Sequence, residues 1–148
     1  MKIPGLLCFA AIGALASSAV LSQMKEAPQT VADVVAKGAK PLSAEQVRAL
    51  LPGATMSRLT PRGFTQRWTN EAGGNFVVST TGLPATSGRA NTGKWNIESN
   101  GRYCVDIDWR AGPAEKWCQF VLQGPDGYFL TPNPKYNSAP ASRFEIGK

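Results

Sequence analysis

The sequence predicts a mainly β protein, a small antiparallel β-meander or barrel with one short N-terminal helix. Two observations lead to this fold class. From Thr55 onward, short runs of alternating or β-branched residues are separated by Gly, Asn and Pro about every eight to twelve residues, which is the spacing of strands and turns. The run Arg102–Trp109 also alternates apolar and polar residues over its whole length, as expected of a strand with one buried face.

One short helix is predicted ahead of the strands, over Ala44–Leu51. Ser43 and Gln46 have the spacing of a capping box, in which each side chain bonds the other residue's backbone N–H group. The apolar residues Val47, Leu50 and Leu51 then fall on one face of the helix, and a Pro-Gly pair directly after them is a typical helix end. We expect the apolar face to pack against the sheet.

Eight strands follow in the prediction, each bounded by turn residues. The strongest turn signal is Asn100-Gly101, a pair that favours a two-residue type I′ hairpin because both residues tolerate positive φ. The segments 82–90 and 132–141 are expected to be loops. The predicted strands are Thr55–Leu59, Phe64–Thr69, Asn75–Thr81, Lys94–Ile97, Arg102–Trp109, Glu115–Gln123, Tyr128–Thr131 and Arg143–Ile146.

Residues 1–19 have the features of an export signal. Lys2 precedes an uncharged apolar run over residues 3–16, which is shorter than the ~20 residues of a membrane span. Small residues at positions 14 and 16, and again at 17 and 19, fit the rule for signal peptidase, and we favour cleavage after Ala19. The alternatives for this stretch are a membrane anchor and a buried helix. A flexible lead segment over 20–41 and one β-rich domain over 42–148 are expected to follow. Val31, Val34 and Val35 in the lead segment could instead form one side of a short helix.

Three cysteines become two once the signal is removed. Cys8 leaves with the signal, whereas Cys104 and Cys118 remain in a chain that we expect to mature in an oxidising compartment, periplasmic or secreted. An even pair in that setting predicts one disulfide. The two cysteines fall in consecutive predicted strands, so the disulfide would cross a hairpin.

The register of this hairpin offers a test of the disulfide. When the two cysteines lie opposite each other, the same register places Asp106 opposite Lys116 and Val105 opposite Trp117. Such cross-strand pairs are each worth ~0.2–1 kcal/mol, and a slip by one residue would turn every side chain to the other face. A disulfide that closes a loop of about 15 residues is expected to add ~3 kcal/mol to the free energy of unfolding.

The charge balance is basic, but the basic residues form no run. The chain carries 16 Lys+Arg and 10 Asp+Glu, a net charge of +6, which becomes +5 when Lys2 leaves with the signal. Scattered basic residues are unlike a nucleic-acid-binding arm, so we expect no nucleic-acid partner. The function that this charge does favour is weak attraction to anionic envelope polymers or lipid head groups. After cleavage, no apolar run predicts a transmembrane segment.

The sequence contains no histidine, which narrows the chemistry it can perform. Ser–His and Cys–His nucleophile pairs and histidine metal sites are excluded, and a disulfide would remove the two mature thiols from such roles. We therefore expect no enzyme activity, no cofactor and no metal. Asp106 and Asp108 lie two apart on one strand face, with Cα atoms ~7 Å apart, and Glu98 or Glu115 could approach them as in a glycosidase. The ordinary interpretation is solvated surface charge.

Aromatic residues are the remaining candidates for a ligand site. Large aromatic side chains usually fill the core of a small sheet, and we expect this of Trp95 and Trp117. Trp109 stands at a strand end, and Tyr136 lies in the proline-rich loop, where exposure is most expected. The candidate ligand contacts are Trp109, Arg110, Tyr136, Asp106 and Asp108.

A series of short motifs runs from residue 93 to residue 146. It consists of Gly93-x-Trp95, Gly101-Arg102-x-Cys104, Trp109, Trp117-Cys118, Gly127-Tyr128 and Phe144–Ile146. The series resembles that of small exported proteobacterial proteins, frequent in rhizobia and their relatives, which share a domain of unknown function. The resemblance covers roughly residues 42–148 and implies a small antiparallel β-domain with a disulfide, without an activity, a cofactor or site residues. The Gly-x-Trp element is also similar to that of lipocalin-type barrels.

The role expected from the sequence is non-enzymatic: binding of an envelope ligand, or support of another envelope protein. One alternative is an inhibitor of a hydrolase such as lysozyme, although lysozymes are generally cationic and a partner of charge +5 would be repelled. The other is a carboxylate-based hydrolase that uses Asp106 and Asp108. An open barrel lined by aromatic residues would indicate a bound ligand, whereas a filled barrel would indicate recognition at the surface.

Overall fold

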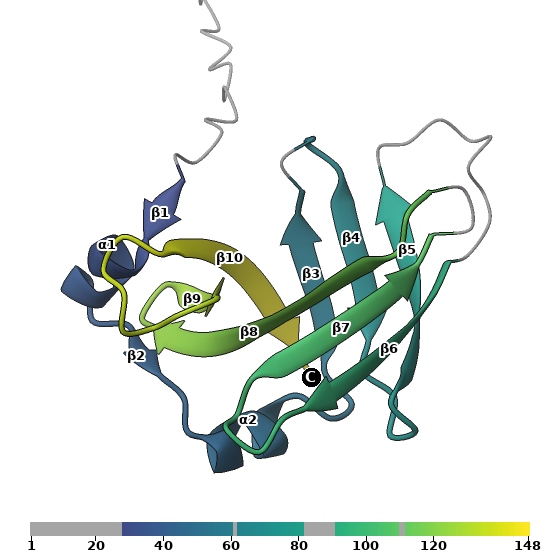
Figure 1. Ribbon diagram of the computed structural model, residues 1–148, viewed down its shortest axis with the longest axis horizontal. Helices are drawn as coiled ribbons and strands as arrows, with labels where there is room; N and C mark the ends of the chain where they lie inside the picture. The colour runs from purple at the N-terminus through teal and green to yellow at the C-terminus, as the bar shows by residue number, and fades with distance from the viewer. Residues whose placement is uncertain (1–27, 61, 82–90, 110–111) are drawn as a thin grey trace, which may run out of the picture.

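The computed structural model describes residues 28–60, 62–81, 91–109 and 112–148. Within these ranges, eight antiparallel strands close into a barrel, and two short helices pack against it (Figure 1). The predicted export signal, the predicted loop at 82–90 and Arg110 lie outside the described residues. The barrel strands are β3 (Thr55–Leu59), β4 (Thr65–Thr69), β5 (Asn75–Thr81), β6 (Asn91–Ile97), β7 (Tyr103–Asp108), β8 (Glu115–Gly124), β9 (Gly127–Thr131) and β10 (Pro140–Gly147).

The strands follow one another around the barrel in chain order. Each pairs antiparallel with the next, and β10 then pairs with β3, with Glu145 opposite Ser57 and Ile146 opposite Met56. This is the connectivity of up-and-down barrels, an architecture that lipocalins share. The predicted fold class is therefore confirmed, and the strand bounds differ from the predicted ones by at most three residues.

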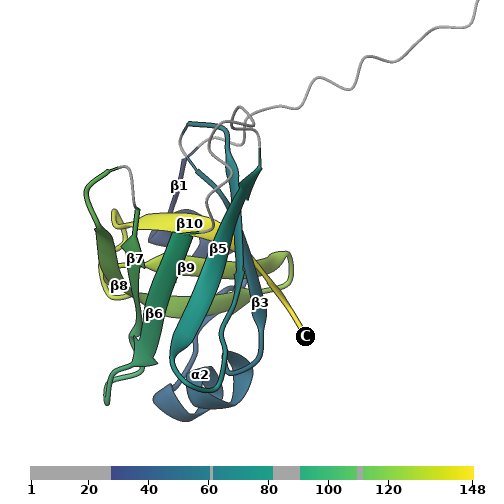
Figure 2. The same cartoon turned by 90° about the vertical axis from the view of Figure 1, so that its right-hand side faces the viewer.

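The predicted helix closes one end of the barrel. It is α2 (Ala44–Leu50), and Figure 2 shows it below the strands. The capping box is present: the Ser43 hydroxyl accepts from the Gln46 N–H at 3.2 Å, and the Gln46 side chain accepts from the Ser43 N–H at 2.8 Å. Val47 and Leu51 are fully buried in the barrel core, as their shared face predicts.

Of the two expectations for the lead segment, the structure has the short helix and adds a short strand on either side of it. This part of the chain forms β1 (Gln29–Thr30), α1 (Val31–Ala36) and β2 (Lys40–Pro41); β1 pairs with β10, and β2 pairs with β8. The physical reason is a second apolar cluster on the outside of the barrel, where Val34 of α1 covers Leu122 and Phe129. Those two residues alternate with inward-facing neighbours, so without α1 they would face water.

The interior of the barrel is filled with side chains. Trp68 lies at its centre, stacked on Phe76 with ring centroids 5.5 Å apart and edge-on to Phe144 at 5.7 Å. Gly93 makes room for this packing, because a Cβ atom there would lie 2.2 Å from the Phe76 ring. Tyr103 and the aliphatic residues of the other strands complete a contiguous core. Among the described residues, the barrel is thus of the filled kind.

The connection between β6 and β7 differs from the predicted type I′ hairpin. Ile97 pairs with Tyr103, so the connection is longer than two residues, and only Gly101 has a positive φ, of 87°. The observed register places Trp95 opposite Val105 on the inner face. A two-residue loop at Asn100-Gly101 would shift the pairing by one residue and turn apolar side chains outward. Burial of the inner face therefore outweighs the local turn preference.

Candidate functional site

The cysteine hairpin has the predicted register. In β7 and β8, Cys104 lies opposite Cys118 and forms a disulfide with it, and Val105 lies opposite Trp117. Asp106 lies opposite Lys116, and its carboxylate is 2.7 Å from the lysine Nζ. The disulfide faces outward, because the inner positions of the same strands belong to the core.

An open hollow of about 690 Å³ lies over the outer face of this hairpin and the neighbouring strand β6. We call it the basic hollow, because Lys94, Arg102 and Lys116 line it, and Asp106 is its single acidic lining residue; these four give a local charge of +2. The full lining consists of Gly73, Gly74, Asn75, Lys94, Trp95, Asn96, Arg102, Cys104, Val105, Asp106, Lys116, Trp117 and Cys118.

The cations of the basic hollow differ in how they are paired. Lys116 is bound to Asp106, and Arg102 lies 3.6 Å from the carboxylate of Glu98. Lys94 lies opposite Asp106 on the other side, yet among the described residues it forms no ion pair. The Lys116–Asp106 pair is exposed, so it is worth at most ~1 kcal/mol, and an anionic ligand can compete for the lysines.

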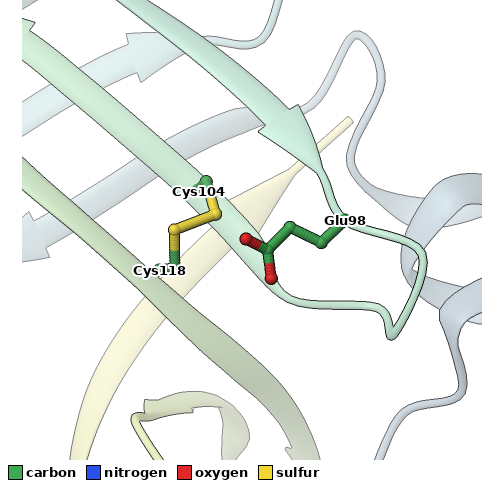
Figure 3. Close-up of side chains that lie close together, drawn as sticks. All are labelled: Glu98, Cys104 and Cys118. Carbon is green, nitrogen blue, oxygen red and sulfur yellow. A yellow bond between two sulfur atoms is a disulfide. The ribbon is translucent and has the colours of Figure 1, made fainter.

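Glu98 lies beside the disulfide rather than beside the two aspartates. Figure 3 shows its carboxylate pointing toward the sulfur atoms of Cys104 and Cys118. One carboxylate oxygen and the two sulfur atoms all lie within 4.8 Å of one another. Arg102 also contacts this group, because its Nη2 donates to the backbone carbonyl of Cys118 at 3.2 Å.

A second polar group lies inside the barrel, at the end opposite α2. We call it the mouth cluster: Arg58, Gln66, Trp109, Glu115 and Trp117. The Glu115 carboxylate is ion-paired with Arg58 and accepts from the indole N–H groups of Trp109 at 3.3 Å and Trp117 at 3.0 Å. Arg58 also donates to Gln66 at 2.7 Å, and its guanidinium lies 5.4 Å from the centre of the Trp117 ring. The polar groups of the cluster bond to one another, which is the arrangement expected of residues that fill the end of the barrel.

The predicted site residues do not gather in one place. Asp106 and Asp108 alternate with core residues and lie on the outer face, whereas Glu115 lies opposite the buried Ile107 on the inner face. The sheet therefore separates Glu115 from both aspartates, and a shared carboxylate site with it does not form. Trp109 belongs to the mouth cluster, away from the basic hollow.

Two of the predicted site residues remain, Tyr136 and Arg110. Tyr136, in the loop between β9 and β10, is 66% exposed, as predicted for this loop. Arg110 lies outside the described residues. Sequence reasoning missed Lys94 and Arg58 as site residues. The alternation of side chains along the strands could have predicted both positions. Arg58 is on the same face of its strand as the buried Met56, and Lys94 is on the same face as the outward Asn96.

The structure places the chain in the class of small, disulfide-bearing up-and-down β-barrels with a packed interior. No protein-family model, curated protein or solved structure matches the chain. The resemblance to small exported proteobacterial proteins therefore stays a prediction. Among the described residues, no helix is long and apolar enough to span a membrane.

Proposed function

We propose that this chain is an exported, non-enzymatic binding domain, periplasmic or secreted, that holds an anionic envelope polymer in the basic hollow. The observation that carries this proposal is the charge of +2 in an open hollow on the outside of a barrel whose interior is filled. The disulfide supports the compartment, because such bonds persist mainly in oxidising environments.

The geometry of the hollow suits a polymer better than a single small anion. Lys94 and Lys116 stand on either side of Asp106 in one cross-strand row. Because neighbouring strands are ~4.8 Å apart, the two lysines start from backbone positions about 10 Å apart. A single anion placed between them would meet the Asp106 carboxylate. A chain of repeated anionic groups can reach both lysines and pass that carboxylate by.

The charge of the whole molecule acts in the same direction. A net charge of +6, or +5 without the predicted signal, attracts polyanions at distances up to the screening length, ~10 Å at 0.1 M salt. The hollow then supplies the local contacts, because a strand framework fixed by a disulfide and barrel closure holds its cations in place. We therefore expect binding that is weak, polyvalent and sensitive to salt.

The test is a pull-down on purified lipopolysaccharide and cell-wall fractions, at low and at raised salt. The double variant Lys94→Gln/Lys116→Gln removes two charges from the hollow. The matched control, Lys37→Gln/Lys135→Gln, removes two exposed lysines beside α1 and in the loop between β9 and β10. At ~1 kcal/mol per surface lysine, the hollow variant should bind about tenfold or more weakly, and the control should bind like the wild type.

Two results would contradict the proposal. If both double variants lose binding equally, overall charge rather than the hollow accounts for attraction. If the wild type retains neither fraction at low salt but captures a stoichiometric protein partner, the domain supports or inhibits another protein instead.

A further inference from the structure

We propose that, when its disulfide is reduced, the chain binds a soft divalent cation such as Zn²⁺ through Cys104, Cys118 and Glu98. This site is independent of polymer binding, since its ligands are two thiolates and a carboxylate rather than the lysines of the hollow. In the oxidised protein the two sulfur atoms are bonded to each other, so the proposal concerns the reduced form.

The three donor atoms already lie within reach of one ion. The Glu98 carboxylate oxygen and both sulfur atoms are within 4.8 Å of one another, and all three residues are partly buried (Figure 3). In a tetrahedral zinc site, with Zn–S ≈ 2.3 Å and Zn–O ≈ 2.1 Å, donor atoms are about 3.6–3.8 Å apart. The Glu98 oxygen is already near both sulfur atoms, whereas the two sulfur atoms, bonded to each other in the structure, must move apart after reduction to meet that spacing. The fourth position would be left to water.

The charges around the three ligands balance. Two thiolates and one carboxylate carry −3, a zinc ion +2, and the guanidinium of Arg102 brings the sum to zero. Arg102 is close enough to contribute this charge, because its Nε lies 3.6 Å from the Glu98 oxygen. Among the described residues, this Arg102 Nε is buried and has no hydrogen-bond partner. The thiolate is the form of cysteine that binds metal.

The step that opens the site is thiol–disulfide exchange with a dithiol reductant. The protein S–S bond breaks, the two reductant sulfurs join in a new disulfide, and two protons pass from the reductant to Cys104 and Cys118. These protons are released when the cation binds. Two electrons are transferred, and both come from the reductant.

The experiment titrates Co²⁺, a spectroscopic stand-in for Zn²⁺, into protein that carries Cys8→Ser and has been reduced with a dithiol, which is removed before the titration. We expect one equivalent to bind with a sulfur-to-cobalt charge-transfer band, which one equivalent of Zn²⁺ abolishes. Glu98→Gln should bind about tenfold or more weakly, a loss at least as large as that from outer-shell changes. Glu45→Gln, on an exposed carboxylate of α2, is the matched control and should bind like the wild type.

Circular dichroism on the same samples shows whether the reduced chain remains folded. A band of equal strength and affinity in wild type and Glu98→Gln would overturn the proposal, because two cysteines of an unfolded chain bind without Glu98. Absence of the band from the reduced wild type would overturn it as well. The oxidised protein must show no band, since its sulfur atoms are not free to ligate.

Discussion

The two ends of the barrel interior each hold a polar cluster among aromatic rings, built from different chemistry. Near α2, Asn70 is fully buried and accepts from the hydroxyl of Tyr103 at 2.7 Å and from the indole of Trp68 at 3.2 Å. At the opposite end, the mouth cluster is ionic, with Glu115 bound to Arg58. There the side chains of Arg58 and Glu115 remain 20% and 30% exposed.

The difference follows from what each kind of group loses on leaving water. A neutral amide or hydroxyl can be buried completely when every donor and acceptor is paired, and Asn70 also donates to the carbonyl of Leu51 at 3.1 Å. A charged group loses far more solvation, several kcal/mol in practice, so its pair is best placed where water still reaches it. The neutral cluster should therefore matter more for stability than the charged one.

Replacing Asn70 should produce the largest effect. Asn70→Ala leaves the buried Tyr103 hydroxyl without its acceptor, a loss that costs ~1–3 kcal/mol. It also removes one of the two donors to the Leu51 carbonyl, which still accepts from the Ala54 N–H at 3.1 Å. We expect the free energy of unfolding to fall by about 3 kcal/mol in urea denaturation. Asn96→Ala, on the outer face, is the control and should change it by less than ~0.5 kcal/mol. Equal effects at both positions would remove the distinction between buried and exposed amides.

Alkaline pH should lower the free energy of unfolding through Tyr103, in the cluster near α2. Burial raises the pKa of Tyr103 above the usual value near 10, because the phenolate is disfavoured away from water, although the hydrogen bonds that Tyr103 shares with Trp68 and Asn70 act in the opposite direction. Below pH 10 the folded and unfolded chains both keep this proton. Above it only the unfolded chain loses the proton, so the free energy of unfolding falls by about 1.4 kcal/mol per pH unit.

The measurement for Tyr103 is urea denaturation at pH 9, 10 and 11 for the wild type and for Tyr103→Phe. The phenylalanine variant lacks the ionisable group, so its stability should decline less steeply above pH 10. Parallel curves for the two proteins would show that Tyr103 ionises as readily in the folded chain as in the unfolded one.

The mouth cluster should give the smallest effect. A double-mutant cycle with Arg58→Met and Glu115→Gln isolates the ion pair from the other contacts of each residue. For a pair that water still reaches, we expect a coupling free energy of about 1 kcal/mol, reduced at high salt. A coupling of 3 kcal/mol or more would mean that the mouth behaves as a dry interior and would reverse the order of the two ends.

Local pattern in the sequence carried a large part of this fold. The capping box at Ser43 and the alternation in β7 depend only on neighbouring residues, and the cysteine pair added the register between β7 and β8. For this hairpin, the register predicted which side chains face the core and that Asp106 pairs with Lys116.

Features that depend on distant parts of the chain were not predictable in the same way. The pairing of β10 with β3 and the docking of Val34 on Leu122 join segments far apart in sequence, and no local pattern encodes them. Glu115 shows the same limit at the site. Its charge favours the surface, whereas the alternation of β8 and the partner Arg58, from a distant strand, place it inside.

Closure of the barrel also sets an order in time. The chain is made from its N-terminus, so β3 is synthesised well before its partner β10, which is the last barrel strand to be made. Until then both β3 and β9 present an open edge with unpaired backbone groups, the usual starting point for aggregation. A chain interrupted before Pro140 keeps both edges open. Pairing of β10 with β3 and β9 therefore protects a newly made molecule from aggregation.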